Sequence, residues 1–174
     1  MFTIPTNNRW SCLPASFSMA CNCPFTDFIN FLGHDGDTRP YKDKSKRRGF
    51  HPQECIDVAW KLGFTCTPIE RYPALVYSYN DTEILPIYFR GSDDGNMARF
   101  MLYLQSTQRG VIEGIRKRAD GLNVGHAVAW DGSFIYDPSH RIYTLEDGMQ
   151  NNFVANKLWI LTEVGYDKTN FLDI

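Results

Sequence analysis

The hydrophobic residues of the first third of the chain recur at intervals of three or four, which is the spacing of one face of an α-helix. We expect helices over residues 12–22, between Thr26 and Gly33, and from Pro52 through Lys61. Ser11 and Thr26 are suited to cap the first two helices, because short hydroxyl side chains accept hydrogen bonds from the free N–H groups of a helix start. Gly63 is expected to end the third helix. The residues of this third helix expected to face the core are Cys55, Ile56, Ala59, Trp60 and Leu62.

Beyond residue 110 the apolar residues occur in short runs separated by turn residues, a pattern typical of β-strands. The runs predict strands over residues 111–115, 126–130, 134–137, 141–145 and 158–163. Asp131-Gly132 is a signal for a tight hairpin between the second and third of these runs. Earlier in the chain we expect strands over residues 64–69 and 84–89 and a helix over residues 96–105. Helices therefore dominate the first half and an antiparallel sheet the second, which predicts an α+β fold with segregated elements.

The composition indicates an ordinary globular domain. With 174 residues, of which 43% are hydrophobic and 14% aromatic, the chain can bury a sizeable core, and we predict one domain over residues 1–174. The net charge of −2 does not suggest nucleic-acid binding, and the basic residues between Lys42 and Arg48 are expected to lie in a solvated loop. We see neither a signal peptide nor an apolar stretch long enough for a membrane span, and expect a soluble, cytoplasmic protein.

The five cysteines are an odd number at irregular spacing, which is a poor disulfide framework. Cys21 and Cys23 form a C-x-C pair, but no second Cys or His pair follows at the spacing of a zinc site. We expect Cys21, Cys55 and Cys66 to be small apolar core residues. We predict no metal and no other cofactor.

Cys12, His126 and Asp137 are the candidate catalytic residues. A cysteine at a helix start is favoured as a thiolate by the free N–H groups and the positive end of the helix dipole, and further by a neighbouring imidazolium. His126 follows Gly125 at the start of one predicted strand, and Asp137 ends the next strand. A hairpin would place these two side by side, so that the carboxylate orients the imidazole and the other ring nitrogen faces a nucleophile.

Each candidate also has a simpler structural interpretation. Cys12 could be a small buried residue, His126 a hydrogen-bonded histidine beside an apolar strand, and Asp137 a turn residue before Pro138. The other possible bases are His34, His51 and His140, none of which follows the same strand pattern. A thiol acyl-transfer site also needs donors for the developing oxyanion. The backbone N–H of Cys12 is one such donor. The side-chain amide of Asn7 or Asn8 could be the second, and the alternative is that these are only loop residues.

Three motif regions resemble the papain-like cysteine peptidases, and most closely the bacteriocin-processing (C39-type) peptidases and their stand-alone relatives. The regions are Cys12-Leu13-Pro14-Ala15-Ser16-Phe17 with the amides before it, the helix from Pro52 to Gly63, and Gly125-His126-Ala127-Val128 with Tyr136-Asp137-Pro138. The order Cys, His, Asp is that of the family. Two features differ, since the family usually has Gln as the oxyanion amide, and Asp or Gly beside the cysteine, where this chain has Ser11 and Leu13.

The resemblance implies a papain-like fold, with the catalytic cysteine at the start of an N-terminal helix that packs on a C-terminal antiparallel sheet. It also implies hydrolysis of a peptide or isopeptide bond in a peptide or protein substrate, with a small residue such as glycine before the cut. Two alternatives remain open at this point. The same triad could serve a deamidase or acyltransferase, or the fold could be a peptide-binding module without turnover.

Overall fold

The computed structural model describes residues 4, 10–37, 49–70, 102, 104–105, 109–117, 121, 123–144, 147 and 153–164. Within these residues the chain forms three helices, α1 (Cys12–Ala20), α2 (Phe25–Leu32) and α3 (Pro52–Lys61). The strands are β1 (Phe64–Glu70), β2 (Gly110–Lys117), β3 (Asn123–Trp130), β4 (Ile135–Asp137), β5 (Arg141–Tyr143) and β6 (Phe153–Glu163). The predicted α+β class is confirmed, with the helices in the first part of the chain and most of the strands in the second.

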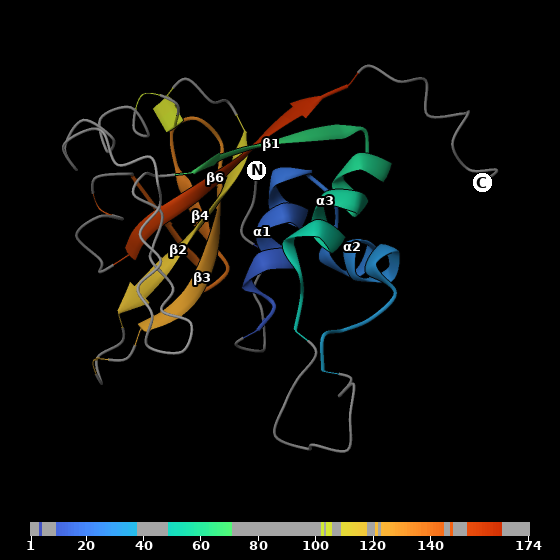
Figure 1. Ribbon diagram of the computed structural model, residues 1–174, viewed down its shortest axis with the longest axis horizontal. Helices are drawn as coiled ribbons and strands as arrows, with labels where there is room; N and C mark the ends of the chain where they lie inside the picture. Colours follow the sequence, from blue (N-terminus) through green and yellow to red (C-terminus); the bar gives the residue numbers. More distant parts are fainter. Residues whose placement is uncertain are drawn as a thin grey trace, which may run out of the picture.

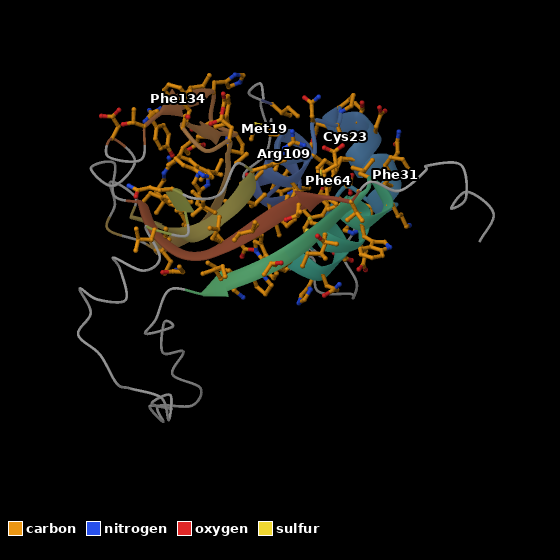
Figure 2. The ribbon with its side chains drawn as sticks, turned by 90° about the horizontal axis from the view of Figure 1, so that it is seen from above. Met19, Cys23, Phe31, Phe64, Arg109 and Phe134 are labelled. Carbon is orange, nitrogen blue, oxygen red and sulfur yellow. The ribbon has the colours of Figure 1, made fainter. Side chains whose placement is uncertain are left out.

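The strands form one antiparallel sheet in the order β1-β6-β2-β3-β4-β5. The helices are grouped on one side of this sheet (Figure 1). Strand β1 joins the sheet beside β6, so the two halves of the chain share the sheet rather than forming separate layers. Figure 2 shows the sheet from above, where Arg109 lies beside Phe64 of β1 with its guanidinium 5.2 Å from the centre of the ring.

The central strands are apolar on both faces, because successive side chains of a strand point to opposite sides of a sheet. Val111 and Ala129 contribute to a core between the sheet and the helices, which also contains Phe17 and Phe28. Their neighbours Ile112, Val128 and Trp130 belong to a second core on the other face. The second core includes Leu104, whose backbone oxygen accepts a hydrogen bond from Trp130 Nε1 at 3.0 Å.

The helix starts differ from the sequence prediction in two respects. Ser11 is the N-cap of α1, but its side chain makes no capping hydrogen bond. Thr26 is not a cap, because α2 begins at Phe25 and Pro24 is its N-cap. The extended backbone of Pro24 (φ −55°, ψ 139°) directs its carbonyl oxygen to the N–H of Phe28 at 3.0 Å, so the first helical hydrogen bond forms before Thr26 could cap. Gly33 ends α2 in the left-handed conformation, φ 75°, as expected.

Helix α3 has the predicted bounds and a capping box at its start. His51 Nδ1 accepts a hydrogen bond from the Gln53 N–H at 3.2 Å, and Glu54 Oε2 accepts one from the His51 N–H at 2.9 Å. The prediction that Trp60 faces the core is wrong, since its side chain is 51% exposed. The buried face consists of Cys55, Val58 and Ala59, and Trp60 lies about 100° around the helix from Ala59.

Several strands are longer than their apolar runs. β6 begins at Phe153 rather than at residue 158, and β3 begins at Asn123 rather than at His126. Backbone pairing continues here through polar and small residues, because the ladder needs only main-chain donors and acceptors. The predicted strand at 84–89 and the basic residues 42–48 lie outside the described residues, as does most of the predicted helix at 96–105. In the part of the chain that is described, no helix has the length and apolar character needed to cross a membrane.

Gly110 and Gly125 offer a matched test of this packing. A Cβ atom on Gly110 would lie 2.7 Å from the Trp159 backbone oxygen, whereas one on Gly125 would meet no heavy atom within 4 Å. Because a backbone atom cannot move aside cheaply, we expect Gly110→Ala to lower the free energy of unfolding by about 2 kcal/mol. Gly125→Ala should leave it unchanged or raise it slightly. Urea denaturation of both variants measures the difference, and equal stabilities would contradict the close β2–β6 packing.

Candidate active site

Cys12 is the first residue of α1, where the backbone N–H groups have no partner within the helix. The side chain of Cys12 is half-buried and packs against the core between the helices and the sheet. The Cys12 carbonyl oxygen accepts a hydrogen bond from Ser16 Oγ at 2.7 Å, which ties the first turn together. Helix α1 packs against β3, the strand that carries His126. The helix therefore brings the thiol to the strand that the sequence analysis singled out.

His126 lies between Cys12 and Asp137. Its Nε2 atom is 3.0 Å from Asp137 Oδ2, and the Cys12 thiol lies near enough to the ring to help raise the pKa of His126. Because Nε2 is occupied by the carboxylate, Nδ1 is the ring nitrogen left for the thiol. The side chain is only 12% exposed, and the ring makes an edge-to-face contact with Phe153 at 5.8 Å. These contacts hold the imidazole in one orientation.

Asp137 is the last residue of β4 and its side chain is fully buried. Three donors converge on its Oδ2 atom, namely His126 Nε2 at 3.0 Å, Arg116 Nη2 at 2.6 Å and the Tyr143 hydroxyl at 3.1 Å. The other oxygen, Oδ1, accepts a hydrogen bond from the Ser139 N–H at 2.8 Å. Asp137 is therefore a turn residue, as in the simpler interpretation of the sequence, through its Oδ1 atom. It contacts His126 through the other oxygen, Oδ2.

These contacts stabilise the ionised form of the carboxylate and the protonated form of the imidazole. Burial alone would raise the pKa of Asp137, but the hydrogen bond and charge of His126 and the N–H of Ser139 outweigh it and hold this pKa well below its usual range. Burial alone would lower the pKa of His126, but the interactions with Asp137 and Cys12 outweigh it and raise this pKa above its ordinary value. Burial and the Asp137 charge raise the pKa of Tyr143, which therefore keeps its proton and donates it.

The sequence analysis did not identify Arg116 or Tyr143. The predicted strand stopped at residue 115, whereas β2 continues to Lys117, and this extension places Arg116 opposite Val124 in the sheet. Gly114 lies opposite His126, so Arg116 is the next side chain on that face of β2. Tyr143 lay within a predicted strand, but its pairing partner was not predicted. In the structure it pairs with Ile135 of β4, two residues before Asp137, and therefore lies on the same face of the sheet as Asp137.

The other candidate residues have separate roles or are not described. Asn7 and Asn8, the predicted oxyanion amides, lie outside the described residues. His34 Nδ1 accepts a hydrogen bond from the Gly36 N–H at 3.1 Å, and its ring stacks on Phe50. His51 caps α3. His140 is exposed, and its N–H donates to the Asp137 carbonyl oxygen at 3.1 Å within the turn after β4.

The remaining cysteines are free thiols in apolar surroundings, as predicted for Cys21, Cys55 and Cys66. Burial raises the pKa of Cys66 to about 11 and raises the pKa values of Cys21, Cys23 and Cys55 as well. A thiol that stays protonated is a weak nucleophile. Among the residues that the structure describes, no group of three or more His, Cys, Asp and Glu side chains is arranged to hold a metal ion.

Comparisons of the chain with protein-family models, with curated protein sequences and with solved structures gave no significant match. The resemblance to C39-type peptidases therefore remains a prediction based on the motif regions. The structure adds an arrangement of side chains to those motifs. In space, the imidazole lies between a thiol at a helix start and a buried carboxylate, and such an arrangement can generate a nucleophile and move a proton.

Proposed function

We propose that this protein is a cysteine peptidase with a papain-like fold, which hydrolyses a peptide or isopeptide bond. The observation that carries the proposal is the position of His126 between the Cys12 thiol and the buried Asp137 carboxylate. Three further features support it. The thiol lies at a helix start, the imidazole is oriented by its contacts, and the protein's other cysteines are in surroundings that disfavour a thiolate.

In the first step the Cys12 proton passes to Nδ1 of His126 and the sulfur attacks the carbonyl carbon of the scissile bond. A C–S bond forms, and the electron pair of the carbonyl moves to its oxygen. The backbone N–H of Cys12 is in the first turn of α1, where it has no partner within the helix, and in this proposal it donates to the oxyanion. In this proposal the side-chain amide of Asn7 or Asn8 supplies the second hydrogen bond.

In the second step the oxyanion collapses and the C–N bond breaks. The leaving amine takes the proton from His126, and the substrate's acyl group remains on Cys12 as a thioester. Water then attacks the thioester carbonyl while His126 accepts one of its protons. The C–S bond breaks, the acid product leaves, and the proton returns to the Cys12 sulfur. Asp137 accepts a hydrogen bond from Nε2 of His126 throughout, which fixes the orientation of the ring.

The test is selective labelling with a peptidyl electrophile that carries glycine next to the reactive group, followed by mass spectrometry of each cysteine peptide. We expect rapid modification of Cys12 near neutral pH, and at least tenfold slower modification when His126 is replaced by alanine. Cys66 is the internal control, because it is also partly exposed but burial raises its pKa to about 11.

The outcomes separate the candidate functions. Fast labelling of Cys12 that depends on His126 supports a working thiol enzyme, and release of new amino termini from a peptide mixture then supports hydrolysis. Release of ammonia without chain cleavage would indicate a deamidase instead. Equal, slow labelling of Cys12 and Cys66 would contradict the proposal and favour a peptide-binding module.

A further inference from the structure

Arg116 makes the shortest hydrogen bond to Asp137 and supplies a permanent positive charge, which the proposed triad lacks. Its Nη2 atom is 2.6 Å from Asp137 Oδ2, the same oxygen that accepts from His126. The Arg116 side chain is 23% exposed and that of Asp137 is fully buried. A buried carboxylate is costly unless it is paired with charge and fully hydrogen-bonded. Arg116 therefore supplies the positive partner of the buried carboxylate, which His126 supplies only while it is protonated.

The charge of His126 changes during the proposed reaction, whereas that of Arg116 does not. His126 is an imidazolium after it takes the thiol proton and a neutral imidazole after it gives this proton to the leaving amine. In the neutral state, His126 and Tyr143 offer Asp137 only uncharged donors. A guanidinium stays protonated at every pH at which proteins fold. Arg116 can therefore keep Asp137 ionised in both states.

The groups around His126 show which charges affect its protonation. Cys12 faces the ring from α1, Asp137 from β4, and Phe153, which is uncharged, from β6. Arg116 from β2 and Tyr143 from β5 reach the ring through the shared Asp137 oxygen. Among these contacts, Arg116 is the permanent positive charge. It opposes a second positive charge on the imidazole while stabilising the carboxylate beside it.

We propose that Arg116 is a positioning residue for His126, which holds the Asp137 carboxylate ionised and in place and limits how strongly this carboxylate stabilises the imidazolium form of His126. This role rests on the proposed peptidase function. Its consequence lies in the second step, where His126 must release its proton to the leaving amine. A lone buried aspartate would stabilise the imidazolium, and so slow this release, more than an aspartate that is already paired with arginine.

The test compares Arg116→Gln, which keeps an amide donor without charge, with Arg116→Lys, which keeps the charge. His126 is titrated by NMR of its imidazole carbon in the full chain. We expect Arg116→Gln to raise the titration midpoint of His126 by about one pH unit. Arg116→Lys should stay within a few tenths of a unit of the unsubstituted protein, and so should Tyr143→Phe, which removes a hydrogen bond without removing charge. An unchanged or lowered midpoint in Arg116→Gln, or equal shifts in the Gln and Lys variants, would overturn the proposal.

A second measurement needs no substitution and applies even where the Gln variant does not fold. In the unsubstituted protein, the Arg116 guanidinium signals should stay in slow exchange with water on both sides of the His126 titration. Loss of these signals when His126 becomes neutral, while the Trp130 indole N–H signal persists at the same pH, would show that Arg116 leaves Asp137, and would overturn the proposal. Neither measurement requires Cys12 to react with a substrate or a label. A peptidase proposal that fails in the labelling experiment is therefore distinguished from an Arg116 role that fails here.

Discussion

Replacing Cys12 by alanine is expected to abolish bond cleavage while the protein stays folded. The side chain supplies the only protein atom that forms a covalent bond to the substrate in the proposed mechanism. We expect a loss of at least about 10⁴-fold in the rate of cleavage, in line with removal of the nucleophile from other acyl-transfer enzymes. The measurement is the release of new amino termini from a peptide mixture, quantified by mass spectrometry for both proteins.

Cys66→Ala is the matched control for Cys12→Ala. Both thiols are partly exposed and lie at the edge of the same apolar core, but burial raises the pKa of Cys66 to about 11. We expect Cys66→Ala to cleave like the unsubstituted protein. Thermal unfolding of both variants shows that the comparison is between folded proteins. Cleavage by Cys12→Ala at the rate of the unsubstituted protein would show that Cys12 is not the nucleophile.

Replacing Asp137 by alanine should produce the largest loss of stability at the site. It leaves the Arg116 guanidinium, the Tyr143 hydroxyl and the His126 ring without their shared acceptor in a buried region. Breaking a buried charged pair by removing one partner costs about 3 kcal/mol or more. We expect a loss of about this size in the free energy of unfolding near pH 6, measured by urea denaturation.

The pH dependence of this loss tests its electrostatic origin. The pKa of Asp137 is depressed in the folded protein, so its contribution is present above the unfolded value of about 4 and is lost as the pH falls below it. The pKa of His126 is raised, so its contribution is present below about 6.5 and is lost as the pH rises through the folded value. The difference between the unsubstituted protein and Asp137→Ala should therefore be largest between about pH 4.5 and 6.5. A difference that does not vary with pH would mean that Asp137 acts through packing alone.

The helices show how much of the fold local sequence can specify. Pro52 to Lys61 forms a helix with the predicted bounds because the periodicity, the proline at its start and the glycine beyond its end all agree. The same periodicity identified only part of the buried face, since Cys55 and Ala59 are buried as expected, whereas Trp60 is 51% exposed and Val58, which was not expected to face the core, is buried. A periodic pattern defines which residues share a face, but the neighbouring elements decide which face is covered.

The strands show a different limit. The apolar runs located the centres of β2, β3 and β6, but the pairing extends beyond them into residues such as Asn123 and Arg116. Strand order was also not accessible from local pattern, because β6 lies between β1 and β2, which precede it by many residues. Pairing between distant strands depends on which partners are available in the folded chain rather than on the residues of one strand.

The sequence by itself determined three parts of the candidate site. Cys12 is at a helix start because the helical pattern begins there, and His126 and Asp137 are close because a tight turn at Asp131-Gly132 pairs their strands. The tertiary structure alone decided that α1 lies against β3, so that the thiol reaches the imidazole, and that Arg116 and Tyr143 share the Asp137 carboxylate. The physical reason is the distance along the chain over which each interaction acts. Caps, turns and periodicity act between residues a few positions apart, whereas the partners of a buried charge are chosen by the packing of elements that are distant in the chain.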